Sequence, residues 1–167
     1  MNYDELQTIL IVEDEAIISI VTSKSVKRFG YNVICANSGE RAVELAAENE
    51  AISLILMDIE LGTGIDGTVA AQRILAIRDI PIVFHTSHSE RDMVERVRGI
   101  TRYGYVIKSS GDFVLQSSLE MAYELFEARG RIPVRDLDDW LDAERIVLAG
   151  HAGQDMEEPE EEEGPEE

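Results

Sequence analysis

Short apolar runs alternate with helix-like segments along residues 8–129. Most residues within a run are apolar, without the strict alternation of a strand that faces water on one side. This pattern is typical of a parallel sheet that is covered on both faces. The runs that predict strands are Thr8–Val12, Tyr31–Cys35, Ile52–Met57, Ile80–His85 and Gly104–Ile107.

Between these runs, apolar residues recur at the three- and four-residue spacing of a helix. The stripes are Ile17, Ile18, Val21, Ser25 and Phe29; Ala42, Leu45 and Ala46; Val69, Ala70, Ile74 and Ile77; Met93, Val94 and Val97; and, within Phe113–Arg129, Leu115, Leu119, Ala122, Tyr123 and Phe126. We expect Gly30 to end the first helix, and Ser38 and Asp66 to cap the next two. Five βα units predict an α/β fold with a doubly wound parallel sheet and helices on both faces.

Polar side chains follow four of the predicted strands. Glu13 and Asp14 come after the first run, Asp58 after the third, Thr86 after the fourth and Lys108 after the fifth. Ligands of doubly wound sheets bind at the carboxyl ends of the strands. Each residue taken alone has an ordinary explanation as chain emerging into water, but together they predict one site.

These residue types indicate phosphoryl-transfer chemistry. Clustered carboxylates repel one another unless a cation lies among them, and Mg²⁺ prefers such oxygen ligands. A lysine and a hydroxyl can stabilise charge on a transferring phosphoryl group. The sequence contains no glycine-rich nucleotide loop of the Walker type, so the nucleophile is expected to be a carboxylate of the protein itself.

The net charge of −19 argues against some partners. Residues 155–167 hold nine acidic residues and no basic one, and the rest of the chain still carries 25 acidic against 15 basic residues. An acidic surface of this kind repels phosphate backbones, so we expect no direct nucleic-acid binding. No apolar stretch is long enough to span a membrane, and the single cysteine, Cys35, excludes an internal disulfide. These features favour a cytoplasmic location.

Four segments resemble the response-regulator receiver domains of two-component signalling. They are ILIVEDE at residues 9–15, LILMDIEL at 54–61, IPIVFHTS at 80–87 and YGYVIK at 103–108. The resemblance covers roughly residues 7–128 and implies a flavodoxin-like sheet with the strand order 2-1-3-4-5. It also implies a signalling module that catalyses only its own phosphorylation and dephosphorylation, rather than an enzyme acting on an external substrate.

The resemblance implies that Asp58 is the phosphoacceptor. The phosphoryl group would come from the phosphohistidine of a histidine kinase or phosphotransfer protein. Asp14 and Asp58 would bind Mg²⁺ directly, Glu13 would bind it through water, and the backbone carbonyl of Glu60 would be a further ligand.

The same resemblance implies a switch. Lys108 would pair with the phosphate, Thr86 would hydrogen-bond to it, and Tyr105 would turn inward when Thr86 shifts. The surface formed by the fourth helix, the fifth strand and the fifth helix would then change its affinity for a downstream protein target or a second copy of the chain.

The sequence departs from the family pattern at three places. Ser109 replaces the usual proline after the lysine, and a cis peptide before serine costs about 2.5–4 kcal/mol. The sequence leaves the conformation of the Lys108–Ser109 peptide open: the loop from Lys108 to Gly111 is a candidate for a trans peptide, a longer reach or greater mobility. Ser87 replaces the usual alanine, and the turn ELGTGIDG at residues 60–67 is longer and richer in glycine. These changes bear on kinetics and loop shape, because no reacting group is lost.

Two flanking residues, Glu60 and His88, could tune the lifetime of the aspartyl phosphate by controlling the attacking water. This hypothesis rests on their position alone, and exposed loop side chains are the alternative. His85 is expected to be a buried, hydrogen-bonded core histidine, and the spacing of His85, His88 and His151 supports no zinc site.

We expect a receiver domain at residues 1–130, a helical C-terminal extension at 131–154 and a disordered acidic tail at 155–167. The extension carries an apolar stripe but is too short for an output domain, so output would come through protein contact or through domains outside this chain. Three hypotheses remain open: a stand-alone receiver, the receiver portion of a larger hybrid kinase or multidomain sensor, and a small α/β Mg²⁺-dependent enzyme.

Overall fold

The computed structural model describes residues 6–87, 91–101 and 103–129; for residues 91–94 it describes the backbone alone. In chain order the elements are β1 (Thr8–Val12), α1 (Ala16–Arg28), β2 (Asn32–Ala36), α2 (Gly39–Glu48), β3 (Ile52–Asp58), α3 (Gly67–Ile77), β4 (Ile82–Thr86), α4 (Arg91–Arg98), β5 (Tyr105–Ile107), a 3-10 turn (Lys108–Ser110) and α5 (Asp112–Ala128). The predictions for residues 131–154 and 155–167 lie outside the described residues, as do His88 and His151.

The predicted sheet is confirmed. Its five strands are all parallel and follow the order β2-β1-β3-β4-β5. The register aligns the carboxyl ends of neighbouring strands: Val12 lies opposite Ala36 and Met57, and Asp58 lies opposite His85. The residues that follow these strands therefore emerge at one edge of the sheet.

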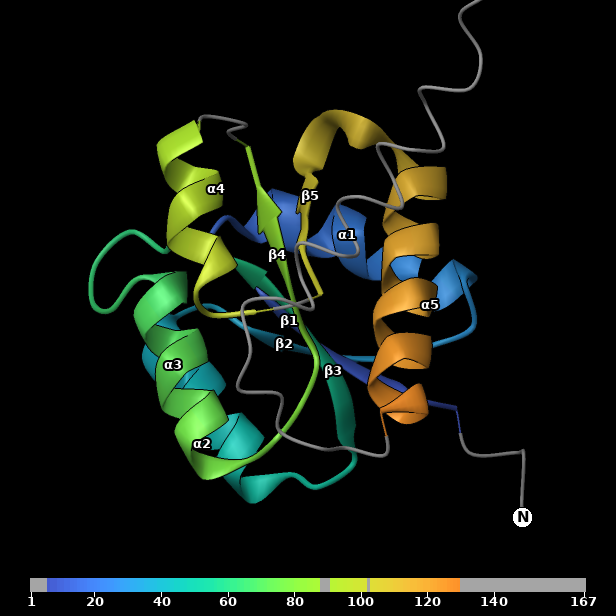
Figure 1. The fold of residues 1–167 in the computed structure, drawn as a ribbon. Helices are drawn as coiled ribbons and strands as arrows, with labels where there is room; N and C mark the ends of the chain where they lie inside the picture. The colour runs from blue at the N-terminus through green and yellow to red at the C-terminus, as the bar shows by residue number, and fades with distance from the viewer. Residues whose placement is uncertain (1–5, 88–90, 102, 130–167) are drawn as a thin grey trace, which may run out of the picture. The chain divides into compact units, whose positions relative to one another are not determined.

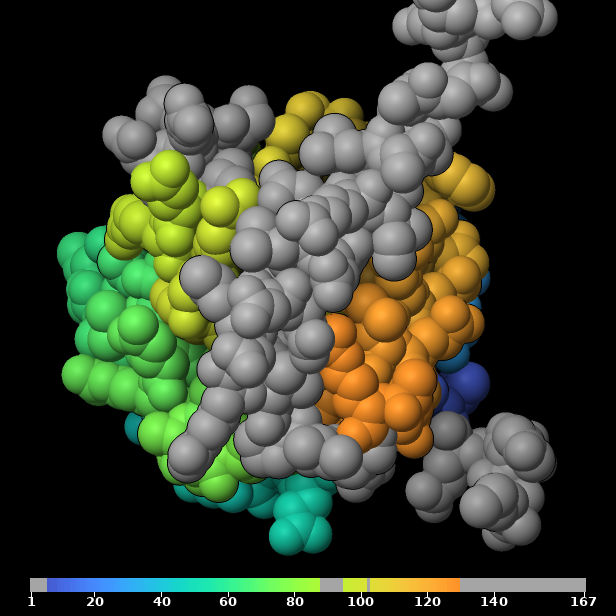
Figure 2. Space-filling model, viewed as in Figure 1, coloured from blue at the N-terminus to red at the C-terminus, as the bar shows by residue number. Residues whose placement is uncertain are grey.

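Helices cover both faces of the sheet, as the continuous apolar strands predicted (Figure 1). One face packs against α2, α3 and α4 through residues that include Ala42, Ile74 and Val97, and the other packs against α1 and α5 through residues that include Val26 and Leu119. The space-filling view places the surfaces of α3 and α4 at one side and that of α5 at the other (Figure 2).

The stripe expected on α1 is partly wrong. Ser25 is buried and Ile18 and Phe29 are half-buried, but Ile17 and Val21 are largely exposed. A step of four residues turns a helix about 40° beyond one full turn, so Ile17 lies about 80° around the helix from Ser25. The buried face of α1 instead contains Thr22, Ser25 and Val26.

The predicted caps are confirmed. The Ser38 hydroxyl accepts a hydrogen bond from the backbone N–H of Arg41 at the start of α2. The Asp66 carboxylate accepts from the backbone N–H groups of Thr68 and Val69 at the start of α3, and it also pairs with Arg96 of α4 at 2.9 Å. Burial raises the pKa of the Asp66 carboxyl, whereas these contacts lower it, and the net direction is downward. Asp66 therefore fixes both the start of α3 and its link to α4.

Gly67 fills a place where a side chain cannot fit. A Cβ atom at this position would lie 1.8 Å from the carbonyl oxygen of Asp58, and the Gly67 N–H donates to the carbonyl of Ile59 at 2.8 Å. The close approach brings the first turn of α3 directly against the end of β3. The glycine therefore helps to set the position of Asp58.

We expect Gly67→Ala to lower the free energy of unfolding by roughly 1–3 kcal/mol, because the added methyl group must displace backbone. Gly99→Ala is the matched control, since a Cβ atom there would meet nothing within 4 Å. Urea denaturation of both variants measures the difference. Equal stability of the two variants would contradict the close approach.

Candidate functional site

The carboxyl edge of the sheet brings together side chains from three strands. Glu13 follows β1, Asp58 is the last residue of β3, and Lys108 follows β5. Glu13 and Asp58 are almost fully buried, at 3% and 4% exposure. Two buried carboxylates this close need a cation to offset their repulsion and the loss of hydration.

Lys108 supplies that positive charge. Its Nζ atom lies 2.6 Å from Glu13 Oε2 and 2.9 Å from Asp58 Oδ2. The other oxygens accept backbone hydrogen bonds: Glu13 Oε1 from Glu15 N–H and Asp58 Oδ1 from Glu60 N–H, each at 3.2 Å. Both buried carboxylates are thus oriented through both of their oxygens.

Burial and pairing act on the site in opposite directions. Burial raises the pKa of the Glu13 carboxyl, the Lys108 hydrogen bond lowers it, the Asp58 charge raises it, and the net direction is upward. Burial alone would lower the pKa of the Lys108 ammonium, but Glu13 and Asp58 outweigh it and raise the pKa. Lys108 therefore stays protonated at neutral pH.

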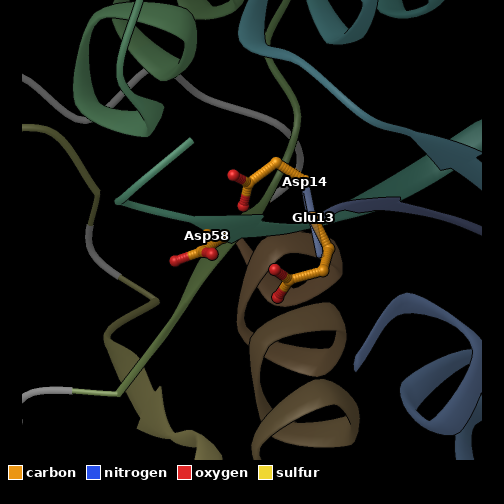
Figure 3. A group of neighbouring side chains, drawn as sticks. All are labelled: Glu13, Asp14 and Asp58. Atoms are coloured by element: carbon orange, nitrogen blue, oxygen red, sulfur yellow. The ribbon is translucent and has the colours of Figure 1, made fainter. Parts of the chain in front are cut away.

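Asp14 completes an acidic group at the same edge (Figure 3). Unlike the other two, its side chain is exposed, and one ligand oxygen from each of Glu13, Asp14 and Asp58 lies within 4.8 Å of the others. The described residues thus offer hard oxygen ligands from two strands with one side open to solvent. This donor set fits a small divalent cation that keeps several of its waters.

The hydroxyl and the aromatic residue of the expected switch lie on the β4–β5 side of the site. Thr86 is the last residue of β4, is buried at 2% exposure and lies opposite Ile107 of β5. Tyr105 begins β5 opposite Phe84, and its side chain is 36% exposed. Thr86 thus lies inside the fold at the end of β4, whereas about a third of Tyr105 is open to solvent.

The segment after Lys108 differs from an extended loop. Residues Lys108–Ser110 form a 3-10 turn, and Gly111, with φ at +85°, leads into α5. Among the described residues no peptide bond is cis, so the Lys108–Ser109 peptide, whose conformation the sequence left open, is trans. The Asp112 carboxylate then accepts hydrogen bonds from Ser25 and Arg28, and so ties the start of α5 to α1.

Of the two tuning candidates, the structure describes Glu60. The Glu60 side chain is exposed next to Asp58, and its backbone N–H contacts the Asp58 carboxylate. His88 lies outside the described residues. An exposed Glu60 side chain fits the tuning hypothesis and the alternative of an ordinary loop side chain equally, so tuning stays a prediction.

His85 is buried at 7% exposure, as expected, but its imidazole has no hydrogen bond within the described part of the chain. Burial, and then the nearby Lys108 charge, lower the pKa of His85 to about 4. The imidazole is therefore neutral at physiological pH, and it belongs to the core between the sheet and α1 and α5.

The pKa of His85 predicts an acid-dependent loss of stability. The unfolded chain binds a proton at His85 near pH 6.5 and the folded chain only near pH 4, so stability falls as the pH drops through this window. Going from pH 7.5 to pH 5 should cost about 2 kcal/mol through this residue. Urea denaturation of wild type and His85→Asn at both pH values isolates the effect, because the other titrating groups are shared. Equal pH dependence in the two proteins would refute it.

Sequence reasoning missed the contacts made by the loop between β3 and α3. Glu40 of α2 accepts a hydrogen bond from the backbone N–H of Ile65 at 2.9 Å. The Gly62 backbone packs against Asp14, where a Cβ atom would lie 2.9 Å from Oδ2. The glycine-rich loop was the only signal in the sequence, and it does not reveal which side chains the loop contacts.

Comparison with known proteins agrees with the fold. The family model of the response regulator receiver domain matches residues 9–120, and the chain belongs to this family. A second model, described as a protein of unknown function (DUF2934), matches residues 120–149. No helix within the described residues is long and apolar enough to cross a membrane.

Two curated regulators illustrate the relationship. Transcriptional regulatory protein PdtaR of Mycobacterium tuberculosis is 36% identical over 119 residues, which cover 71% of this chain and 57% of PdtaR. Phyllosphere-induced regulator PhyR of Methylorubrum extorquens is 37% identical over 89 residues, 53% of this chain and 33% of PhyR. The chain thus spans less than two thirds of the length of these relatives.

Solved structures show the same likeness. The N-terminal domain of a response regulator/sensory box/GGDEF 3-domain protein from Carboxydothermus hydrogenoformans has a TM-score of 0.68 and 44% identity, covering 73% of this chain and 98% of its own. A CheY-like receiver domain protein from Methanospirillum hungatei has a TM-score of 0.69 at 20% identity, covering 75% and 99%. The second likeness is one of fold alone.

Proposed function

We propose that this protein is a phosphoacceptor receiver of a two-component phosphorelay, phosphorylated on Asp58 by a histidine kinase or phosphotransfer protein. The observation that carries the proposal is the bridge from Lys108 to Asp58 and Glu13, with Asp14 in the same cluster. Two-component signalling is what the receiver family implies, and the acidic cluster is the site that such a reaction needs.

In the proposed reaction a carboxylate oxygen of Asp58 forms a bond to the phosphorus of a phosphohistidine. The bond from phosphorus to the imidazole nitrogen breaks, and the nitrogen leaves with the electron pair. Glu13, Asp14, Asp58 and the backbone carbonyl of Glu60 would hold Mg²⁺, which when bound offsets the negative charge of the phosphoryl oxygens. Lys108 already contacts Asp58 and would pair with the phosphoryl group.

The signal would leave the site through Thr86 and Tyr105. Thr86 would donate its hydroxyl hydrogen bond to the phosphoryl oxygen, and the exposed Tyr105 ring would turn into the space on that side. The surface of α4, β5 and α5 would then shift between two states with different affinity for a protein target. This route is supported by the burial of Thr86 and the partial exposure of Tyr105.

The surface beside Asp14 supports a protein as phosphodonor. The first turns of α1 carry Ile17, Ile20 and Val21, all more than half exposed. Exposed apolar side chains grouped on one helix are typical of protein-interaction surfaces. A donor that covers this helix would bring its phosphohistidine close to the acidic edge.

The greater length of the relatives supports an alternative, in which this receiver is part of a multidomain sensor. The similar Carboxydothermus domain belongs to a 3-domain protein, and PdtaR extends well beyond the matched region. The chemistry at Asp58 is the same in both hypotheses, so the two differ only in how the output is delivered.

Phosphorylation should depend on Asp58. Incubation with Mg²⁺ and a small-molecule phosphodonor should add one phosphoryl group to wild type, and Asp58→Asn should abolish the addition because the amide is not a nucleophile. Intact-protein mass spectrometry measures the change. Asp79→Asn is the matched control, since Asp79 is exposed and precedes β4 at the opposite end of the strand.

Persistent labelling of Asp58→Asn, or no labelling of wild type, would overturn the proposed function. Loss of labelling in Asp79→Asn would instead show that the substitution type, rather than the site, caused the effect.

The lifetime of the aspartyl phosphate should depend on the flanking residues. Glu60→Ala and His88→Ala should each change the dephosphorylation rate by more than about twofold, because a positioned side chain controls the attacking water. Decay of the labelled protein after removal of the phosphodonor measures the rate. Rates within twofold of wild type for both variants would refute tuning while leaving the role of Asp58 intact.

A further inference from the structure

The side chain of Asp14 is held differently from those of its two neighbours. Glu13 and Asp58 each make an ion pair with Lys108 and a backbone hydrogen bond, whereas Asp14 has neither within the described residues. It is also exposed, so the sheet does not confine it. Any limit on the directions in which this carboxylate can point therefore comes from another part of the fold.

The loop between β3 and α3 supplies that limit. Gly62 lies so close to Asp14 that a Cβ atom would be 2.9 Å from Oδ2, and its φ of +62° belongs to the left-handed region that favours glycine. The backbone of this loop therefore forms one wall beside the Asp14 carboxylate. If the loop moved outward, Asp14 would gain rotamers that point away from Glu13 and Asp58.

The loop is anchored at its far side by α2. The Glu40 carboxylate accepts the Ile65 N–H at 2.9 Å, and Gly64, with φ at +96°, approaches so closely that a Cβ atom would lie 2.6 Å from Oε1. Gly39 packs equally tightly on Ile65, where a Cβ atom would lie 2.6 Å from Cγ1. The hydrogen bond from Ile65, then that from its own backbone N–H, lower the pKa of Glu40, so the anchor is ionised at neutral pH.

We propose that Glu40 is a positioning residue for the acidic site: by holding the loop at residues 62–65 against Asp14, it keeps this carboxylate aligned with Glu13 and Asp58 for divalent-cation binding. The inference rests on the proposed function, since it assigns Glu40 a role in the same site. Groups that orient metal ligands from outside commonly change metal affinity by 10–100-fold when they are removed.

The test is the affinity of the whole 167-residue chain for Mn²⁺, a paramagnetic probe for the Mg²⁺ site, measured by electron paramagnetic resonance of the free ion. Glu40→Ala should weaken binding about tenfold, and Glu40→Gln, which keeps an oxygen acceptor for the Ile65 N–H, should restore most of the affinity. Glu44→Ala is the matched control, because Glu44 is also an exposed α2 carboxylate but pairs with Arg41.

A second variant changes the loop at the end that lies beside Asp14. Gly62→Ala places a methyl group against Asp14 while Glu40 is intact, and it should weaken Mn²⁺ binding in the same way. The amide NMR signals of Gly64 and Ile65 in the metal-free protein should shift in Glu40→Ala and stay near wild type in Glu44→Ala. Thermal unfolding is measured for each variant. In Glu40→Ala the melting temperature should stay near that of wild type while the affinity for Mn²⁺ falls.

Affinity of Glu40→Ala within twofold of wild type, or unshifted loop amides, would overturn the inference and leave the proposed function standing. If wild type itself neither bound Mn²⁺ nor accepted a phosphoryl group, the proposed function and this inference would both be overturned. Phosphorylation of wild type at Asp58 together with unchanged metal affinity in Glu40→Ala would support the proposed function and overturn the role of Glu40.

Discussion

One ammonium group between two buried carboxylates is the interaction on which the site depends. Glu13 and Asp58 come from adjacent strands, so the sheet itself places them side by side. Lys108 comes from β5, which is separated from β3 by β4. Strands in a sheet lie about 4.8 Å apart, so the backbones at the ends of β3 and β5 are about 10 Å apart, and the side chains of Asp58 and Lys108 together cross that gap. Only a long, flexible cationic side chain can make that crossing and still contact both carboxylates.

This arrangement explains why the carboxylates can stay buried. An isolated buried ion is strongly destabilising, whereas an ion pair supplemented by hydrogen bonds can offset its loss of hydration. Here every oxygen of Glu13 and Asp58 has a partner, either Lys108 or a backbone N–H group. The positions of Glu13 and Asp58 are therefore set by the fold before any phosphoryl group or metal arrives, whereas the exposed Asp14 carboxylate is limited by the loop that packs beside it.

Much of the fold and of the acidic site could be predicted from the sequence, because the sheet topology determines which strand ends lie together. Apolar runs indicated the strands, parallel strands share a carboxyl edge, and so Glu13, Asp58 and Lys108 had to converge whatever the detailed packing. The caps at Ser38 and Asp66 followed from local chemistry. Predictions of this kind depend on short-range rules or on strand order alone.

Other features depend on tertiary contacts that the sequence does not encode locally. Ile17 and Val21 fit a helical stripe, but the phase of α1 against the sheet is fixed by packing, and they face solvent. Similarly, the contact of Glu40 with Ile65 joins residues 25 positions apart on two elements whose spacing no pattern reveals. His85 looked like a residue that needed a hydrogen bond, yet it is accommodated as a neutral ring.

The glycines between β3 and α3 also bear on the sequence freedom of this segment. Surface loops usually tolerate substitution better than the elements they connect. Here Gly62 and Gly64 adopt positive φ, and a Cβ atom at Gly67 would collide with the backbone of Asp58, so a side chain would be strained at three positions in six. This exposed turn is therefore among the least mutable parts of the molecule, and selection on it would act on backbone shape rather than on side-chain chemistry.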